Sequence, residues 1–407
     1  MKNNSCKIDE IIAKARAACP GCAGTVSAHR NLALSFLSEA ISKAAGRLVS
    51  ANEADLAAAR RLGADEALLE DMRLDYIGIG ALAGRIRHMA GAADPTDERE
   101  AWRRENGLTV EQLRVPLGLL LIIAGASVKK TLEAVAACIK TGNAVILLRS
   151  EVTPATDEVI VNLLFSAFAC CGLSADWVNP VPYTTESLSR LLTRRGEIDA
   201  AVLLGSRAQN ALLRKSAELP VIESSFGTNH IYIDEGADIA AAVQGVIESK
   251  RAFLPSAVNT VLVNWMISDD FLPALEGPAM AAGIELAGDA RVRSTLHGIA
   301  EAREADRTDA GGRLLLITVN SLSDALAHIQ KYGAGLCEGI YSGRAENIEQ
   351  FCRRADAGAL AVNAPPAKAA GYEAGLGADL GLSADKLGQR GPMGLARLTT
   401  LKYILKG

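Results

Sequence analysis

Aromatic residues are scarce in this sequence and make up only 4% of its 407 residues. Proteins that bind nucleic acid commonly stack bases on aromatic rings and present a basic surface. This chain instead has a formal net charge of -4 and a sequence pI near 5.9. The composition therefore predicts no nucleic-acid partner.

Membrane-length apolar runs are also missing. The longest run, residues 117–128, contains Gly118 and Gly125, and it is shorter than the roughly 20 residues that cross a bilayer. Residues 1–5 lead into a polar helical pattern without the apolar segment of a secretory signal. Eight cysteines in a chain of this length, with no signal, are typical of reduced thiols. We therefore expect a cytoplasmic protein with no membrane partner.

The spacing of a metal site is missing as well. Cys19-Pro20-Gly21-Cys22 forms a C-x-x-C motif. No second such motif and no pair of histidines follows it at the spacing of a zinc site. We interpret it as a turn between two helices rather than a redox dithiol or half of a zinc site, and we predict no metal ligands.

A regular apolar periodicity is present in the first quarter of the chain. Between residues 7 and 90, apolar residues recur every three or four positions, which predicts helices. Residues 94–97 (DPTD) interrupt this pattern. Residues 107–114 then alternate apolar with polar side chains, as in an exposed strand or hairpin arm. We expect this arm to serve in oligomerisation.

From residue 115 the pattern alternates strands with helices. Such alternation predicts a parallel sheet with helices on both faces, whose ligands bind at the carboxyl ends of the strands. A helix at 237–250 leads into a second unit of the same kind, and the glycine-rich tail from 371 ends in a short strand, 401–405, placed to pair with a partner subunit. The predicted strands are 119–123, 144–148, 200–204, 259–264, 313–318 and 359–363, and the predicted helices are 130–141, 153–170, 269–282, 321–331 and 345–356.

Several motifs, in order along the chain, resemble the gamma-glutamyl phosphate reductase (glutamate-5-semialdehyde dehydrogenase) family of the aldehyde dehydrogenase superfamily. They span almost the whole sequence. They are residues 114–118 (RVPLG), 140–147 (KTGNAVIL), 230–234 (HIYID), 255–256 (PS), 259–261 (NTV), 375–383 (GLGADLGLS), 390–395 (RGPMGL) and 398–400 (LTT).

The resemblance implies an α/β fold of the aldehyde dehydrogenase type. It would combine a Rossmann-type nucleotide-binding domain (1–104 and 115–245), a smaller catalytic domain (246–370) and an oligomerisation arm with the C-terminal tail (105–114 and 371–407). The family reduces L-glutamate 5-phosphate with NADPH to the semialdehyde, in proline biosynthesis. A cysteine thiolate displaces phosphate, and hydride then reduces the thioester. NADP as cofactor and a homo-oligomer are therefore implied.

The position that the family gives to this cysteine is occupied here by valine. Where the family has Pro-Ser-Thr-Cys-Asn-Thr-Val, residues 255–261 read PSAVNTV, so Val258 replaces the thiol and Asn259 follows it. The family's next residues, Glu-Thr-Leu, are missing before Leu262, which would shorten the strand that leaves the site. Valine offers neither a nucleophile nor a titratable group.

Both substrate loops implied by the resemblance also differ from the family. The family's Tyr-Glu-Ala-Arg-Pro-Asn corresponds to residues 124–129 (AGASVK), which place Ser127 at the arginine and Lys129 at the oxyanion-donating amide. The family's Asn-Ala-Ser-Thr-Arg-Phe corresponds to residues 363–368 (NAPPAK), which keep Asn363 but lose the arginine and gain stiffening prolines. Lys129 or Lys130 still offers a positive charge, and Gly388 replaces a family histidine.

Two segments resemble the superfamily's cofactor site. Residues 148–154 (LRSEVTP) resemble Lys-Pro-Ser-Glu-x-Thr-Pro, whose lysine and glutamate hold the ribose; here Arg149 would have to substitute for the lysine, beside Ser150 and Glu151. Gly205-Ser206 resembles the Gly-Ser at a helix N-terminus where pyrophosphate lies. The same pair also makes an ordinary strand-to-helix turn capped by Ser206.

Glu223 precedes Asp234 by the spacing at which superfamily members place a general base. The alternative is a glutamate in a turn with two serines. Cys337, in an expected loop, and Cys352, on an expected helix, are the remaining thiols of the second unit, and we expect neither to replace the nucleophile. His230 begins a strand and is expected to be hydrogen-bonded within the fold.

Three functions remain open from the sequence. The first is an active reductase of the family type. The second is a pseudoenzyme that binds a metabolite, a nucleotide or an active paralogue. The third is a repurposed enzyme that uses Glu223 on another small-molecule ligand. The thiol, the oxyanion donor and the substrate arginines are all missing. The sequence therefore predicts that the chain does not catalyse the family's own reaction.

Overall fold

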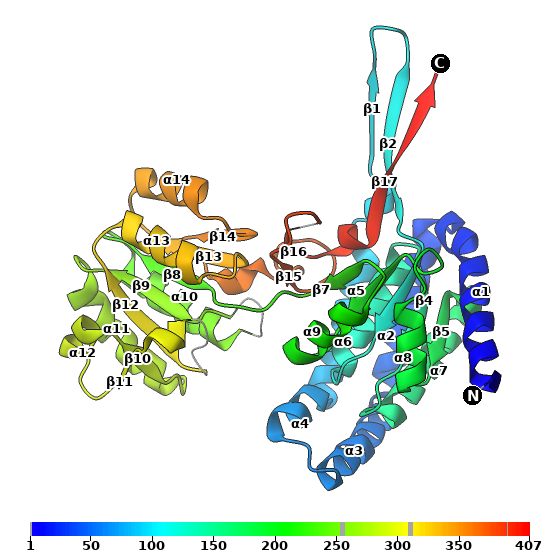
Figure 1. Ribbon diagram of the computed structural model, residues 1–407, viewed down its shortest axis with the longest axis horizontal. Helices are drawn as coiled ribbons and strands as arrows, with labels where there is room; N and C mark the ends of the chain where they lie inside the picture. The colour runs from blue at the N-terminus through cyan, green and yellow to red at the C-terminus, as the bar shows by residue number, and fades with distance from the viewer. Residues whose placement is uncertain (1, 253–256, 308–311, 389) are drawn as a thin grey trace. The chain divides into compact units, whose positions relative to one another are not determined.

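The computed structural model describes residues 2–252, 257–307, 312–388 and 390–407. The chain forms two compact units (Figure 1). Unit 1 comprises Met1–Glu223, Leu376–Leu380 and Gly394–Gly407, and unit 2 comprises Ser224–Gly375 and Gly381–Met393. We expected the first boundary at residue 245. It lies earlier because β8 (His230–Ile233) is hydrogen-bonded between β9 and β13 of unit 2.

A five-stranded parallel sheet in the order β5-β4-β3-β6-β7 forms the centre of unit 1. Its middle strand is a continuous apolar run in which every residue is buried, as expected for a strand covered on both faces. The three strands expected here are confirmed, and two shorter ones were not expected. The strands are β3 (Leu119–Ile123), β4 (Ala144–Leu148), β5 (Val178–Val181), β6 (Ala200–Leu203) and β7 (Val221–Glu223).

Helices cover this sheet, and the C-x-x-C motif lies within the first of them. Cys19 and Cys22 are part of α1, which continues through Pro20, so the turn expected there is wrong. Helix α7 is long and apolar enough to cross a membrane by length and composition alone. It packs against α2 and α3 within the unit. The helices are α1 (Lys2–Gly24), α2 (Ser27–Lys43), α3 (Ala45–Arg61), α4 (Glu66–Met72), α5 (Tyr76–Gly91), α6 (Val128–Lys140), α7 (Pro154–Cys171), α8 (Thr185–Leu192) and α9 (Arg207–Ser216), with short 3-10 turns η1 (Pro95–Asp97), η2 (Ala175–Trp177) and η5 (Leu395–Leu398).

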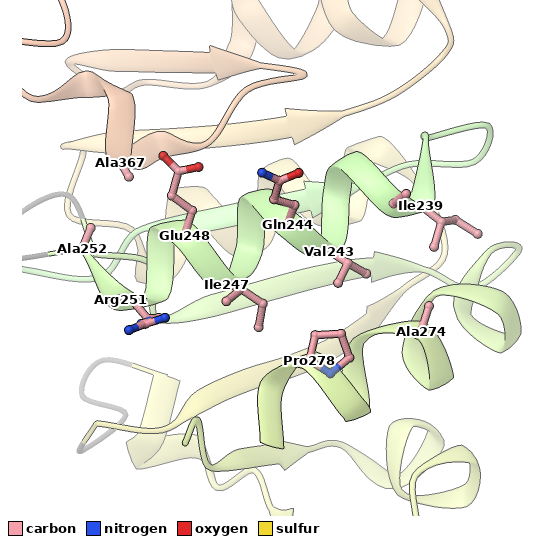
Figure 2. A pocket seen from close by; sticks show the side chains of 11 residues that line it. Ile239, Val243, Gln244, Ile247, Glu248, Arg251, Ala252, Ala274, Pro278 and Ala367 are labelled. Carbon is pink, nitrogen blue, oxygen red and sulfur yellow. The ribbon is translucent and has the colours of Figure 1, made fainter. Parts of the chain in front are cut away.

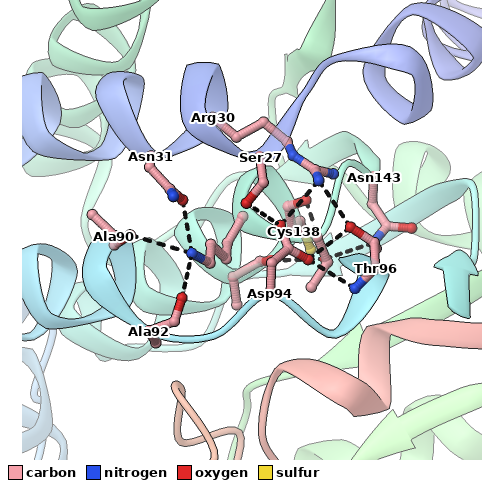
Figure 3. A network of polar contacts seen from close by, with 12 residues as sticks. Ser27, Arg30, Asn31, Ala90, Ala92, Asp94, Thr96, Cys138 and Asn143 are labelled. Atoms are coloured by element: carbon pink, nitrogen blue, oxygen red, sulfur yellow. Dashed lines mark hydrogen bonds and ion pairs between the residues drawn. The ribbon is translucent and has the colours of Figure 1, made fainter. Parts of the chain in front are cut away.

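Buried charges connect α2 and the end of α5 to the end of α6 (Figure 3). The Lys140 ammonium, at the end of α6, is fully buried and donates to Asn31 Oδ1 at 2.7 Å and to the carbonyl oxygens of Ala90 and Ala92 at 3.2 and 2.7 Å. Beside it, Arg30 pairs with Asp94 at 2.9 Å. Because buried charges are tolerated only when they are paired or hydrogen-bonded, these contacts fix where α2 and α5 lie on unit 1.

The expected hairpin arm is confirmed. Strands β1 (Arg99–Arg103) and β2 (Thr109–Pro116) pair antiparallel. The C-terminal strand, β17 (Thr399–Lys406), pairs antiparallel with β2 of the same chain from Thr399↔Pro116 to Lys406↔Thr109. The strand that we placed opposite a partner subunit therefore completes a three-stranded sheet within its own chain.

Unit 2 is built on a seven-stranded parallel sheet in the order β11-β10-β12-β9-β8-β13-β14. Helices cover it, with apolar clusters between helices and strands. The strands are β8 (His230–Ile233), β9 (Thr260–Asn264), β10 (Leu286–Gly288), β11 (Ala300–Glu301), β12 (Leu314–Val319), β13 (Cys337–Tyr341) and β14 (Ala359–Val362); the helices are α10 (Ile239–Arg251), α11 (Ser268–Ala281), α12 (Ala290–Thr295), α13 (Leu322–Tyr332) and α14 (Ala345–Arg354). Shorter elements are η3 (Glu304–Arg307), η4 (Pro366–Ala369) and the hairpin of β15 (Leu382–Ser383) with β16 (Gly391–Pro392).

Candidate active site

Three loops meet at the carboxyl edge of the unit 1 sheet, because β3, β4 and β6 are adjacent and parallel. The backbone N–H of Ala124 donates to Leu148 O at 3.1 Å, and that of Leu204 donates to Ile123 O at 3.3 Å. A Cβ on Gly125 would lie 2.3 Å from Leu204 O, so only glycine allows this approach. The structure thus brings the first substrate loop and both expected cofactor segments to one edge.

The loop between β4 and α7 is held by its own contacts. Arg149 donates from Nη2 to Pro154 O at 2.7 Å, and its buried Nε has no partner among the described residues. Ser150 is buried, and its N–H donates to Asp157 Oδ2 at 2.8 Å. Glu151 is exposed. Burial raises the pKa of the Asp157 carboxyl to about 6.

Asp55 of α3 adds a second carboxylate beneath the same loop. It accepts the N–H groups of Ala155 and Thr156 at 3.1 and 2.9 Å, and the Thr156 hydroxyl at 2.7 Å. A carboxylate in this position satisfies donors at the start of α7. No local pattern indicates this contact, because about one hundred residues separate the partners.

After β6, Gly205 and Ser206 lead into α9, with Ser206 at the N-cap position. The Ser206 hydroxyl accepts the Gln209 N–H, and the Gln209 side chain accepts the Ser206 N–H at 3.0 Å, which completes a capping box. The expected N-cap is confirmed. Part of the donor set that would face a pyrophosphate is therefore used within the chain.

The remaining substrate-loop residues of unit 1 lie at the start of α6. Ser127 is buried at the N-cap position, and its carbonyl oxygen accepts the Thr131 N–H. Lys129 is half-buried in the first turn of the helix. Neither side chain supplies the amide or guanidinium that the resemblance implies at these positions.

Glu223 is the last residue of β7, and its carboxylate is ion-paired. Its Oε1 lies 2.8 Å from Nη1 of Arg214, a largely exposed residue of α9. Arg214 was not anticipated, since nothing in its helical pattern points to a residue of the next strand.

In unit 2, Val258 is completely buried. It belongs to an apolar cluster that includes Val261 of β9 and Phe271 of α11. Its backbone N–H donates to Ser249 O at 3.1 Å. Strand β9, which follows, is five residues long and pairs with strands on both sides. Pro255 and Ser256 lie outside the described residues.

Asn259 is hydrogen-bonded to the backbone of Asn229, the residue that precedes β8. Its Oδ1 accepts the Asn229 N–H, and its own N–H donates to Asn229 O, both at 3.1 Å. Asn229 in turn donates from Nδ2 to Ala257 O at 2.9 Å and accepts the Cys337 N–H at 3.2 Å. The segment 257–259 is therefore fixed to the ends of β8 and β13.

Asn363, in the second substrate loop, also has a local structural role. It adopts a positive φ of 49°, accepts the Ser342 N–H at 2.9 Å and donates to Ser342 O at 3.1 Å. These bonds close the turn after β14. Side-chain amides tolerate this backbone conformation better than most residues do.

The remaining thiols of unit 2 do not replace the nucleophile. Cys337 begins β13 rather than lying in a loop, is completely buried, and has a pKa raised to about 12 by burial. Cys352 is exposed on α14. Between Cys171 and Cys337 the sequence contains no cysteine.

His230 is hydrogen-bonded within the fold, as expected. Its Nδ1 lies 3.0 Å from Glu338 Oε2, and both side chains are fully buried. Within the described ranges, no group of three or more His, Cys, Asp or Glu side chains is arranged to hold a metal ion.

Comparison with known proteins places this geometry in a family. The sequence model of the aldehyde dehydrogenase family matches residues 2–282, so the chain belongs to that family. The curated gamma-glutamyl phosphate reductase of Clostridium beijerinckii is 35% identical over 381 residues, 92% of this chain and 92% of the relative. That of Thermobifida fusca is 33% identical over 406 residues, 98% of this chain and 97% of the relative. Within the aldehyde dehydrogenases the chain is thus a member of the gamma-glutamyl phosphate reductase branch.

Solved structures agree with this placement. The crystal structure of gamma-glutamyl phosphate reductase from Thermotoga maritima superposes with a TM-score of 0.90 at 27% identity, covering 98% of each chain. A propionaldehyde dehydrogenase from Clostridium phytofermentans, at 16% identity and a TM-score of 0.71, covers 98% of this chain and 96% of that chain, and it shares the fold. The α/β aldehyde dehydrogenase-like fold expected from the sequence is confirmed.

Proposed function

We propose that this chain keeps the gamma-glutamyl phosphate reductase scaffold but does not carry out the family's thiol-dependent reduction. One observation carries the proposal: the segment before β9 contains no cysteine, since none lies between Cys171 and Cys337, and Val258 lies in an apolar core. Acyl transfer from a phosphate through a thioester requires a thiolate that the substrate can reach. Losing a nucleophile of this kind typically removes several orders of magnitude of turnover.

The burial of Val258 also supports a second alignment of the same motif. If no residue is deleted before β9, the family's Cys-Asn-Thr-Val-Glu-Thr-Leu corresponds to residues 255–261, with Pro255 at the cysteine and Val258 at the valine. Neither proline nor valine is a nucleophile, so the proposal is the same in both alignments.

We infer that NADP is not recognised here in the family's manner. Leu148, at the position of the superfamily lysine, is fully buried in β4. The Arg149 guanidinium donates to Pro154 O, and the Ser206 hydroxyl accepts from Gln209. Among the residues expected to hold the cofactor, Glu151 has the carboxylate that the resemblance assigns to ribose binding, and its side chain is exposed. The residues at these positions therefore do not fit the cofactor.

We favour a pseudoenzyme over a repurposed enzyme. A repurposed enzyme would use the Glu223 carboxylate as its base, and this carboxylate is ion-paired with Arg214. We propose a cytoplasmic homo-oligomer that binds a small-molecule ligand, or a hetero-oligomer with a thiol-bearing relative. The arm supports oligomerisation: Trp102, Val110 and Leu405 lie side by side across its three strands, with Trp102 and Leu405 exposed.

A turnover assay tests the proposal. The purified chain is given phosphate, NADP and glutamate 5-semialdehyde, and formation of NADPH is followed; the reverse direction uses enzymatically generated glutamate 5-phosphate with NADPH. The reductase from Thermotoga maritima, assayed identically, is the positive control. We expect no turnover by this chain at an enzyme concentration at which the control consumes its substrate within seconds. Phosphate-dependent formation of NADPH by this chain would refute the proposal.

A further inference from the structure

Two hollows of unit 2 differ in chemical character. One runs along α10 and has a volume of about 1040 Å³. Figure 2 shows the apolar side chains of Val243 and Ile247 directed towards Pro278 across it. The other has a volume of about 440 Å³ and is lined mainly by polar side chains. This polar hollow therefore has the groups with which a protein selects a small molecule by hydrogen bonding.

The polar hollow lies at the carboxyl edge of the parallel sheet of unit 2. Asp234 follows β8, Asn264 ends β9 and Asn320 follows β12, and all three line it. Strand β9 is hydrogen-bonded to both β8 and β12, so these ends meet. Open parallel sheets bind ligands at this edge. Val258 precedes β9 and lies at the opposite, amino edge, so the hollow is separate from the position that the family gives to its nucleophile.

Three of the lining residues belong to one hydrogen-bond network around the Asp234 carboxylate, which is 1% exposed. Its Oδ1 accepts the Tyr232 hydroxyl at 2.8 Å, and its Oδ2 accepts the Ser342 hydroxyl and Asn347 Nδ2, both at 2.7 Å. Asn264 Nδ2 donates to the Tyr232 oxygen at 3.0 Å. Because a satisfied buried network is rigid, it holds the carboxamides of Asn264 and Asn347 in place.

Other lining groups keep unused hydrogen-bonding capacity. Asn320 and Gln350 are exposed, and neither side chain is hydrogen-bonded to another residue in the described part of the chain. Asn347 uses its Nδ2 on Asp234, and its Oδ1 accepts no hydrogen bond from the described residues. A carboxamide offers both donors and acceptors. The hollow can therefore present donors and acceptors to the same ligand.

The charges of the lining favour a neutral ligand. Asp234 is engaged by the network, and Glu235 is ion-paired with Arg344. Among the described residues, no cationic side chain lines the hollow. The lining therefore repels an anion and offers no free carboxylate to a cation. Hydroxyl groups both donate and accept, so they match the carboxamides, while Met266 and Leu322 offer apolar surface to a carbon skeleton.

We propose that this hollow binds a neutral polyhydroxylated small molecule, a sugar or a polyol, through the carboxamides of Asn320, Asn347 and Gln350. Its volume falls within the range of about 300–1,000 Å³ that is typical of small-molecule sites. The inference goes beyond the proposed function and does not rest on it, because none of these residues is near the missing thiol in the sheet.

Methyl NMR of the full chain, with methionine labelled by ¹³C at its methyl group, tests the site. Met266 lines the hollow, and Met280 of α11 is an exposed internal control outside it. Met266→Leu and Met280→Leu assign the two resonances. We expect D-glucose, D-ribose or myo-inositol to shift the Met266 resonance saturably and to leave that of Met280 unchanged. No saturable shift of Met266 with any of the three, or equal shifts of both resonances, overturns the proposal.

A pair of variants on α14 tests the role of the carboxamides. Gln350→Leu removes one of them, and Glu349→Leu is the matched control, since Glu349 is exposed on the same helix and does not line the hollow. For the neutral probe that binds best, we expect Kd to rise at least tenfold in Gln350→Leu and to stay unchanged in Glu349→Leu. An unchanged Kd in Gln350→Leu contradicts the proposal. Tighter binding of spermidine or of D-glucose 6-phosphate than of the neutral probes overturns the ligand class.

Discussion

The backbone N–H of Val258 donates to the carbonyl oxygen of Ser249 at 3.1 Å. This bond ties the residue that precedes Asn259 to the last turn of α10, with the Val258 side chain facing the core. The Val258 side chain therefore packs in the core of unit 2. A side chain in this position does not face a ligand.

The first prediction concerns Val258→Cys. We expect the new thiol to be protected from alkylation in the native chain, because burial in an apolar core excludes the reagent and raises a thiol's pKa. The variant should lose about 1 kcal/mol of unfolding free energy, since valine and cysteine differ in shape and volume. Labelling by iodoacetamide, before and after addition of guanidinium, measures this in a Cys170→Ser, Cys352→Ser background.

Activity gives the complementary readout for the same variant. We expect no reductase turnover from Val258→Cys. Rapid native labelling together with recovered turnover would instead place position 258 at the family's nucleophile and would show that the substrate loops still function.

The second prediction concerns pH. Burial raises the pKa of Asp157 to about 6 in the folded chain, above its value in an unfolded chain. The stability contributed by its protonated form is therefore complete below the unfolded pKa and is lost as the pH rises through about 6. Urea unfolding between pH 4.5 and 7.5, compared with Asp157→Asn, isolates this contribution.

We expect Asp157→Asn to be the more stable chain at pH 7.5 and to show a flatter dependence on pH. An amide at this position still accepts the Ser150 N–H and carries no buried charge. If the two chains showed parallel pH profiles, the Asp157 carboxyl would not be the titrating group.

The third prediction concerns Lys140→Met. The substitution removes the donor to Asn31 Oδ1 and to the carbonyl oxygens of Ala90 and Ala92. A buried acceptor left without a donor costs about 1–3 kcal/mol. Only the Ala90 contact is buried and the other two are part-buried, so we expect a total loss of roughly 2–5 kcal/mol by chemical denaturation. Lys43→Met is the matched control: Lys43 pairs with Glu39 on the surface, and its replacement should change stability by less than about 0.5 kcal/mol. Equal effects of the two substitutions would contradict the role assigned to the buried ammonium.

Local sequence pattern predicted the fold well where burial is continuous. Strands β3 and β4 begin and end at the expected residues, because uninterrupted apolar runs bounded by glycine define them. Strand β13 was missed because it contains Glu338, whose burial depends on His230, more than one hundred residues away. Strand β5 was missed because Asn179 and Pro180 interrupt its pattern. The helix through Pro20 was missed because proline and glycine usually mark a turn.

The order of the motifs predicted where the candidate site lies. It did not predict which groups its side chains contact. The expected residues around 124–129, 149–151 and 205–206 do share one sheet edge, because parallel strands end together. What those side chains contact depends on residues that no motif contains, such as Asp157 for Ser150 and Arg214 for Glu223. The burial of Val258 likewise follows from packing against α11, which local spacing does not encode.

The pairing of β2 with β17 joins residues 109–116 to 399–406, almost three hundred positions apart. During synthesis from the amino terminus, all of unit 2 is made before β17, the strand that pairs with β2. Until β17 has been synthesised, one edge of β2 is unpaired and can hydrogen-bond to strands of neighbouring nascent chains. A chain that is interrupted before residue 399 keeps this edge unpaired and is therefore prone to aggregate through the hairpin.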